Sequence, residues 1–168
     1  MGFYRKYILP RATPFACSLK PTMLQRSKVV PLASGRVLEV GIGSGLNLPF
    51  YAPGKVDHLW GLDPSRENWT LTDGKRAPVD FDLEFLQAAA EAIPLDDASA
   101  DCILLTYTLC SLSAVRPAME EMRRVLKPGG QLLFCEHGTA PDARVRRWQY
   151  RLNPLWRRVS GGCNLNRT

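Results

Sequence analysis

The sequence lacks a long hydrophobic run, which bears on where the chain can reside. No stretch approaches the roughly 18 consecutive apolar residues that a membrane-spanning helix needs, although hydrophobic residues make up 45% of the 168 residues. Arg5, Lys6 and Pro10 interrupt the apolar residues at the start, so a signal-peptide pattern is missing as well. We therefore expect a cytoplasmic protein, and the length favours a single domain with one core.

The sequence lacks paired cysteine motifs, which disfavours disulfides and a metal site. The five cysteines are an odd number and none forms a C-x-x-C pair, so we expect free, mostly buried thiols and no metal site. Cys110 could be interpreted as a nucleophile, but the sequence shows no base near it, which favours an inert thiol. The full set is Cys17, Cys102, Cys110, Cys135 and Cys163.

Acidic residues are missing from both ends of the chain. Residues 1–36 carry seven Lys or Arg and residues 144–168 carry seven Arg, with no acid in either segment. Residues 37–143 hold eight basic and sixteen acidic residues, so this middle part has a net charge of −8, whereas the whole chain has a net charge of +6. The basic ends could bind an anionic membrane surface or a nucleic acid, or they could be solvated helix faces. The start also resembles a mitochondrial transit peptide in composition, although its prolines oppose that interpretation.

Apolar segments of strand length alternate with helical segments along the middle of the chain. Strands are expected over residues 36–40, 58–62, 82–87, 101–106 and 131–135. Helices are expected over 21–30, over 115–126 (with Val115, Met119, Met122 and Leu126 on one face), from Leu46 and from Ser65. This alternation predicts an α/β fold with a doubly wound, mostly parallel sheet and a ligand at the carboxyl ends of its strands. We expect residues 1–35 to form a helical cap on a domain of residues 36–168.

A glycine-rich turn follows the first expected strand, in the stretch L-E-V-G-I-G-S-G. A dinucleotide site would need G-x-G-x-x-G, but here the order is G-x-G-x-G and Leu46 stands where the third glycine should be. Glu39, just ahead of the turn, would repel a pyrophosphate but could hold an ammonium group. S-adenosylmethionine combines a nucleoside with a cationic amino-acid tail, so it fits this turn better than a dinucleotide.

The next strand ends in G-L-D, and its acid suits the same ligand. Asp63 could accept both ribose hydroxyls, while Gly41, Gly43 and Gly45 let the backbone pass close to the cofactor. Alternatively, Asp63 could cap the helix that follows it, and Glu39 could be a simple charge at a strand end. Because the two carboxylates end consecutive strands, we predict a binding site for S-adenosylmethionine.

Four motifs together resemble the class I S-adenosylmethionine-dependent methyltransferases. They are L-E-V-G-I-G-S-G, G-L-D-P, A-E-A-I-P-L-D-D-A-S-A-D and R-R-V-L-K-P-G-G-Q-L-L-F-C-E-H. Within that family the chain resembles the ubiquinone/menaquinone-biosynthesis-like branch. Through Y-T-L-C-S, C-E-H-G and G-C-N-L-N-R it is similar to small bacterial relatives of thiol-methylating, lipid-associated methyltransferase-like proteins. The resemblance implies a Rossmann-like sheet, S-adenosylmethionine as cofactor, and a small or lipophilic acceptor such as a thiol, phenol or quinone precursor.

The resemblance also implies which residues hold the cofactor. The residues after the third strand flank the adenine, and Ala89 stands where many relatives have an aspartate. Tyr4 and Tyr7 resemble a segment that closes over the methionine end, although they could equally pack an N-terminal helix. The implied cofactor-binding set is Glu39, Gly41, Ile42, Gly43, Gly45, Asn47, Asp63, Pro64, Ala90, Glu91, Thr106 and Tyr107.

Methyl transfer from a sulfonium needs little catalytic machinery, because the enzyme mainly aligns the acceptor and excludes water. His137, in the Glu-His pair after the fifth strand, is the candidate base for an acceptor that must lose a proton, or else a structural hydrogen-bonding group. Tyr107 is expected to line the floor between cofactor and acceptor. No Asn/Asp-Pro-Pro-aromatic turn follows the fourth strand, which disfavours methylation of nucleic-acid amines.

The sequence shows no strand pair after the fifth strand, although family members complete a seven-stranded sheet there. The 32 residues after Glu136 contain a basic amphipathic stretch, Val145 to Arg158, and the motif G-G-C-N-L-N-R. The chain thus looks truncated, which would leave the fifth strand as an open edge for self-association. An alternative function is a cofactor-binding but inactive fragment, or a regulatory module that binds a partner or a membrane through its basic ends.

Overall fold

The computed structural model describes residues 17–74 and 76–167, so Tyr4 and Tyr7 lie outside the described residues. Five parallel strands form one sheet in the order β3-β2-β1-β4-β5. The order reverses between β1 and β4, which makes the sheet doubly wound and confirms the predicted α/β class. The strands are β1 (Gly35–Val40), β2 (Val56–Leu62), β3 (Asp82–Leu86), β4 (Ala100–Thr106) and β5 (Leu126–Cys135).

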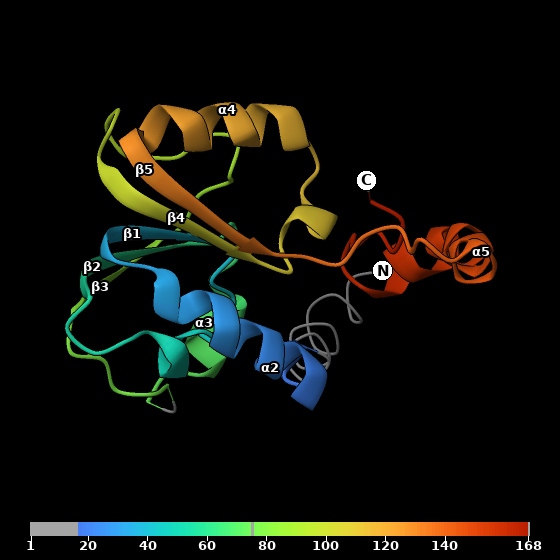
Figure 1. Ribbon diagram of the computed structural model, residues 1–168, viewed down its shortest axis with the longest axis horizontal. Helices are drawn as coiled ribbons and strands as arrows, with labels where there is room; N and C mark the ends of the chain where they lie inside the picture. Colours follow the sequence, from blue (N-terminus) through green and yellow to red (C-terminus); the bar gives the residue numbers. More distant parts are fainter. Residues whose placement is uncertain (1–16, 75, 168) are drawn as a thin grey trace.

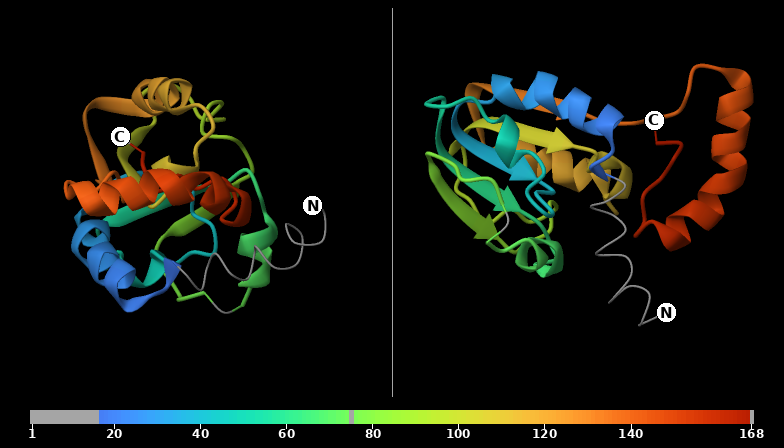
Figure 2. Two further views of the ribbon diagram at one scale, coloured as in Figure 1. Left: turned by 90° about the vertical axis from the view of Figure 1, so that its right-hand side faces the viewer. Right: turned by 90° about the horizontal axis from the view of Figure 1, so that it is seen from below.

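Helices lie on both faces of the sheet and beyond one end of it. In Figure 1, α4 (Val115–Val125) lies above the sheet, and α2 (Lys20–Val29) and α3 (Glu67–Leu71) lie below it. The long helix α5 (Ala143–Val159) stands apart, beyond the carboxyl ends of the strands, as the right-hand view in Figure 2 shows. Short 3-10 turns complete the structure: η2 (Val30–Leu32), η3 (Leu48–Phe50) and η4 (Leu109–Ser111).

The sheet has a packed core on each face. Along β4, Cys102 and Leu104 belong to the core that includes residues of η2 and η3, whereas Ile103 and Leu105 belong to the core that includes Met122 of α4. Successive strand residues point to opposite faces. Because both faces are covered, the strands read as nearly continuous apolar runs rather than as an alternation of apolar and polar residues.

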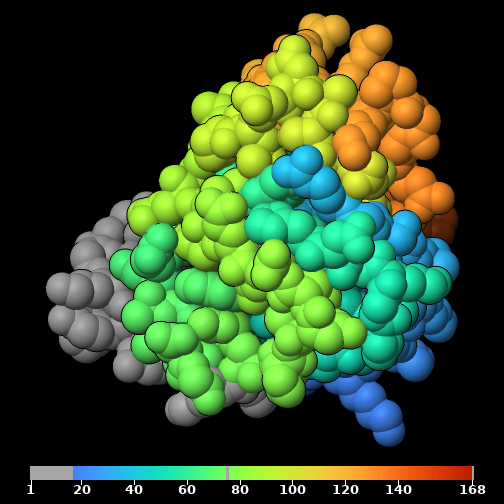
Figure 3. Space-filling model, turned by 90° about the vertical axis from the view of Figure 1, so that its left-hand side faces the viewer, coloured from blue at the N-terminus to red at the C-terminus, as the bar shows by residue number. Residues whose placement is uncertain are grey.

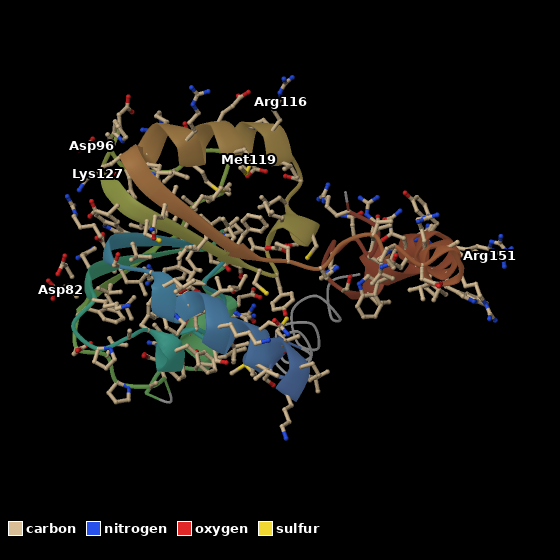
Figure 4. The ribbon with its side chains drawn as sticks, in the orientation of Figure 1. Asp82, Asp96, Arg116, Met119, Lys127 and Arg151 are labelled. Carbon is tan, nitrogen blue, oxygen red and sulfur yellow. The ribbon has the colours of Figure 1, made fainter. Side chains whose placement is uncertain are left out.

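The apolar face predicted for the helix over residues 115–126, which is α4 in the structure, packs onto this sheet. Ala118, Met122 and Val125 are buried, and Met119 packs against the same core. Figure 4 shows Met119 on the side of α4 that faces the sheet, while Arg116 points away from it. The 3.6-residue period therefore identified Met119 and Met122 correctly, whereas predicted Leu126 belongs to β5 and Val115 is only half-buried.

Two boundary predictions are wrong. The α-helix expected from Leu46 is only the single 3-10 turn η3, because Pro53 and Gly54 follow closely and do not allow the helix to continue. The fifth strand begins at Leu126, directly after α4, and not at Gln131. The Pro-Gly-Gly segment forms the start of β5 across an irregularity in its pairing with β4, and Gly129 there has φ +78°.

The end of the molecule opposite α5 is formed by loops that lead into the strands. In Figure 3, which shows that end, segments from blue to orange meet and α5 is almost hidden. Asp82, Asp96 and Lys127 lie at this end in Figure 4. Between Cys135 and Arg167 the structure contains α5 and no further strand, and in this described part β5 pairs only with β4. None of the helices in the described ranges is both long and apolar enough to cross a membrane.

Candidate active site

A cavity of about 500 Å³ opens at the carboxyl ends of the strands, on the side where α5 stands. Its volume lies in the range typical of sites for small molecules. Leu62, Leu112 and Ile42 give it apolar surface, and Arg26 is its buried cation. The residues predicted from sequence that line it are Gly41, Ile42, Gly43, Asp63, Pro64, Ala90, Glu91, Thr106 and Tyr107.

Glu39 lies in a buried polar network next to the cavity and does not line it. Its side chain is only 2% exposed, and its carboxylate accepts hydrogen bonds from Asn47 Nδ2 at 2.9 Å and the Tyr51 hydroxyl at 2.7 Å. Asn47 Nδ2 also donates to Thr106 Oγ1 at 2.9 Å. Asn47, which is fully buried, is likewise absent from the cavity wall, as are Gly45 and His137, so these predicted site residues do not line it. Glu39 is therefore connected to the cavity only indirectly, because Asn47 links it by hydrogen bonds to Thr106, which lines the cavity.

Arg26 of α2 is a member of this network that sequence reasoning missed. It is 5% exposed, and its Nη1 donates to Asn47 Oδ1 at 2.7 Å and Thr106 Oγ1 at 2.5 Å. Its guanidinium lies 5.2 Å from the centre of the Tyr107 ring. Among the described residues, its buried Nε has no hydrogen-bond partner. In the sequence Arg26 is one of several basic residues in the acid-free start, and no pattern distinguishes it from solvated ones.

Asp63 fixes the glycine turn to the end of β2. One carboxylate oxygen accepts from Gly43 N at 3.1 Å and the other from Ser65 N at 2.9 Å. Burial raises the pKa of Asp63, and the two backbone donors oppose that rise. Both oxygens keep unused lone pairs, so the carboxylate can accept hydroxyl groups from a ligand in the cavity.

Tyr107 directly follows β4 and adopts a conformation that is rare for a residue with a side chain, with φ +57°. Its amide donates to Cys135 O at 2.9 Å, and desolvation raises the pKa of its hydroxyl to about 12. Glu136 holds the next turn, since its Oε1 accepts from the amides of Thr108 at 2.6 Å and Leu109 at 3.0 Å. Residues in sparsely populated backbone regions cluster at ligand sites, and Tyr107 lines the cavity.

Glu91 is engaged in a structural contact. Its Oε1 accepts from Ser113 Oγ at 2.8 Å and from Ala114 N at 3.2 Å, and the Ser113 bond lowers its pKa. These bonds join the loop after β3 to the segment that leads into α4. The side chain thus shapes the cavity rim, whereas buried Ala90 contributes apolar surface.

Cys110, His137 and Cys163 lie together beside the site. Cys163 Sγ is 3.4 Å from Cys110 Sγ and 3.3 Å from His137 Nε2. The prediction that no base stands near Cys110 is wrong, because β5 pairs with β4 and places His137, two residues beyond its end, within 4.8 Å of Cys110. The contacts with Cys110 and His137 lower the pKa of the Cys163 thiol, and the contact with Cys163 raises the pKa of His137.

The buried carboxyl of Glu39 should make stability depend on pH. Burial raises its pKa from 4.5 to about 7, so the folded state binds its proton more tightly than the unfolded state does. This stabilisation is complete below about pH 4.5 and is lost as the pH rises through about 7. We expect Glu39→Gln to remove roughly 3 kcal/mol of pH-dependent change in the free energy of unfolding across that window.

Urea unfolding of wild type and Glu39→Gln at pH 4.5 and pH 7.5 would measure this difference. Glu120→Gln is the matched control, because Glu120 lies on the surface of α4 with its side chain 71% exposed. It should keep the wild-type dependence on pH. An equal pH dependence in wild type and Glu39→Gln would show that Glu39 is already ionised throughout the range.

Comparison with known proteins gives consistent relatives. The sequence profile of the methyltransferase domain family matches residues 38–134. Human thiol S-methyltransferase TMT1B is 31% identical over 172 aligned residues, covering 98% of this chain and 70% of that protein. The rat protein of the same name is 35% identical over 78% of this chain and 54% of its own length. A demethylmenaquinone methyltransferase of Clavibacter sepedonicus is 34% identical over 71% of this chain and 48% of its own length.

Solved structures agree with the fold. YcgJ from Bacillus subtilis has a TM-score of 0.63 at 27% identity and covers 86% of this chain and 61% of its own. A SAM-dependent methyltransferase from Aquifex aeolicus, at 22% identity and a TM-score of 0.63, covers 89% of this chain and 87% of its own. The chain thus spans about half to 70% of the length of these curated relatives.

Proposed function

This chain belongs to the methyltransferase domain family of class I S-adenosylmethionine-dependent methyltransferases, and from that premise we propose that it methylates a small, lipophilic thiol. The observation that carries the proposal is the cavity over the glycine turn, which has both Asp63 and buried Arg26 in its wall. S-adenosylmethionine carries ribose hydroxyls, a carboxylate and an ammonium group. An acid and a cation in one cavity match the first two of these groups.

Each part of the cofactor has a candidate partner in the cavity. Asp63 accepts the ribose hydroxyls, and the backbone at Gly41 and Gly43 allows close passage of the ligand. The guanidinium of Arg26, which lines the cavity, binds the methionine carboxylate. The ammonium group sits next to Asn47 and Glu39, and its positive charge favours the ionised form of the Glu39 carboxyl. Ala90 and Glu91 flank the adenine.

The acceptor is proposed from the relatives together with the lining. Two of the similar proteins are named thiol S-methyltransferases and another is named a demethylmenaquinone methyltransferase. The cavity has apolar side chains beside Tyr107 and Thr106, which suits a lipophilic thiol. A phenol or a quinone precursor is the next acceptor to test. Nucleic-acid amines are not proposed as acceptors, because the Asn/Asp-Pro-Pro-aromatic turn does not follow the fourth strand.

The chemistry is an in-line displacement. The acceptor loses its thiol proton, and the resulting thiolate sulfur attacks the methyl carbon of the sulfonium. A new carbon–sulfur bond forms as the bond to the sulfonium breaks, and the products are a methyl thioether, S-adenosylhomocysteine and a proton. Tyr107 and Thr106 shape the floor and exclude water, which supports alignment of the two sulfur atoms. His137 is the nearest candidate base, but its Nε2 already contacts Cys163.

Thermal unfolding tests cofactor binding. S-adenosylmethionine or S-adenosylhomocysteine at 100 times its Kd should add about 2.7 kcal/mol and raise the Tm by roughly 5 to 10 °C. NAD is the negative control, and Asp63→Ala should lose most of the shift because the ribose hydroxyls lose their acceptor. A shift with NAD of the same size, or none with either adenosyl compound, would contradict the proposal.

A second candidate function is a module that binds the cofactor without turnover and contacts a partner or membrane through its basic ends. The observation that favours it is α5, where Trp148, Leu155 and Trp156 are exposed beside several arginines. Figure 4 shows Arg151 of this helix pointing away from the rest of the molecule. Formation of S-adenosylhomocysteine with 2-mercaptoethanol as acceptor separates the two functions. A Tm shift without turnover of this or other model thiols would support the binding module.

A further inference from the structure

Three side chains with soft or borderline metal-ligand atoms meet at the edge of the site, from segments far apart in the sequence. Cys110 lies on η4 after β4, His137 follows β5 by two residues, and Cys163 lies in the loop after α5. Their ligand atoms all lie within 4.8 Å of one another. Cys110 is buried, and the other two residues are half-buried. Three such donors are the usual number of protein ligands in a zinc site that keeps one position open.

The spacing fits a metal better than a disulfide. A tetrahedral zinc ion with ordinary bond lengths separates two sulfur ligands by about 3.8 Å, and a sulfur and a nitrogen by about 3.6 Å. The observed separations are 3.4 Å and 3.3 Å, so small side-chain movements would admit the ion. A disulfide would require the two sulfur atoms to be about 2.05 Å apart, and both cysteines are free thiols in the structure.

The backbone around the cluster is fixed by hydrogen bonds that do not involve the ligand atoms. The amide of Asn164 donates to Cys110 O at 2.9 Å, and Asn164 Nδ2 donates to the same oxygen at 2.9 Å. Arg167 Nη2 donates to Leu112 O at 2.5 Å. The motif G-C-N-L-N-R, which the cofactor site does not use, therefore holds Cys163 against the end of β4. Such outer contacts orient the ligands of metal sites.

The cluster adjoins the cavity through its neighbours. Thr108 and Ser111 flank Cys110 and line the cavity, and so does Gly161, two residues before Cys163. The Tyr107 ring lies 6.5 Å from the His137 ring at an interplanar angle of 23°. Among the described residues, no fourth Cys, His, Asp or Glu joins the three. A fourth coordination position can therefore be taken by water or by an acceptor.

We propose that Cys110, His137 and Cys163 bind one zinc ion, and that the sulfur of the thiol acceptor takes its fourth position. A zinc ion lowers the pKa of a bound thiol, so the acceptor binds as thiolate and releases its proton to solvent. The sulfur then attacks the sulfonium methyl group in the displacement described above, with no change in oxidation state. The role of the acceptor rests on the proposed function, whereas the metal site itself does not.

Metal analysis of the untagged chain tests the site. The protein is dialysed against zinc with a phosphine as reductant and then freed of unbound metal. We expect one zinc ion per chain in wild type, and at least roughly tenfold less in Cys163→Ser and His137→Ala. Cys102→Ala is the matched control, because Cys102 is a buried thiol in the core, and it should keep the full content. Wild type without zinc, or variants that retain it, would overturn the site.

Cobalt replacement tests the fourth position by a readout other than activity. The cobalt-loaded chain should show thiolate charge-transfer and tetrahedral d–d absorption. Addition of 2-mercaptoethanol should change the d–d bands, while its S-methyl ether should leave them unchanged. Bands that do not respond to the thiol would overturn the acceptor role.

The cofactor experiment distinguishes failure of this inference from failure of the proposed function. A Tm shift with S-adenosylhomocysteine in a chain that binds no zinc overturns only the metal site. A zinc-loaded chain without that shift overturns the methyltransferase proposal and leaves the metal site in place. Cys163→Ser and His137→Ala change half-buried residues and could therefore disturb the fold. The same Tm shift with S-adenosylhomocysteine in these variants shows that they are folded.

Discussion

Arg26→Met should weaken binding of S-adenosylhomocysteine by roughly 100-fold, because a hydrogen bond to a charged group contributes about 1.5 to 3 kcal/mol. The substitution keeps most of the apolar stem of the side chain and removes the only guanidinium that lines the cavity among the described residues. It also removes the donor that Asn47 Oδ1 and Thr106 Oγ1 share. Titration calorimetry of wild type and variant measures the change in Kd.

Two comparisons separate recognition of the carboxylate from a general structural effect. Lys28→Met changes the charge equally on the same helix, at an exposed position outside the cavity, and should leave the Kd within about twofold of wild type. Methylthioadenosine has the nucleoside but no carboxylate, so Arg26→Met should hardly change its affinity. If both ligands lost affinity equally, Arg26 would be a structural residue that supports the turn.

Gly41→Ala should destabilise the fold more than an ordinary substitution at a turn. Gly41 has φ +80°, and a Cβ there would approach two side-chain atoms of Thr108, Oγ1 and Cγ2, with Cγ2 at only 2.6 Å. Thr108 cannot easily move away, since its Oγ1 donates to Val40 O at 3.0 Å and its amide to Glu136. We expect a loss of at least about 3 kcal/mol from backbone strain and overpacking together, which lowers the Tm by roughly 6 to 12 °C.

Gly54→Ala is the matched control for this change. Gly54 also has a positive φ, +67°, but a Cβ added there meets no atom within 4 Å. Its cost should be limited to the backbone term, about 1 to 2 kcal/mol. Calorimetric unfolding of both variants gives the difference, which isolates the contact with Thr108. Equal Tm losses in the two variants would mean that the turn relaxes and that Thr108 does not restrict it.

The core on α4 illustrates what could be predicted from local pattern. The period of Met119 and Met122 marked the buried face of the helix, and apolar runs such as that of β4 marked strands covered on both sides. The start of β5 was predicted too late because Pro128, Gly129 and Gly130 follow α4. Proline and glycine end helices, but they are also tolerated at the irregular start of a strand. Local chemistry alone does not distinguish these two uses.

The candidate site also contains residues that could be placed from the sequence and residues that could not. The turn around Gly41 and Gly43 and the strand end at Asp63 could be placed from sequence, because parallel strands bring their carboxyl ends to one edge of a sheet. The orientation of Glu39 could not, since a strand-end carboxylate can point into a cavity or into the protein. Its bonds to Asn47 and Tyr51 are decided only when η3 packs beneath β1.

The sequence by itself determined the family, the strands that make up the sheet, and the glycine turn, since these can be recognised from residues close together in the chain. Only the tertiary structure decided the partners of Arg26 and the meeting of Cys110 with Cys163, 53 positions later. No local period or spacing encodes such contacts. They arise because the chain folds both α2 and the loop after α5 back over the carboxyl ends of the strands, and burial there gives these polar groups their chemistry.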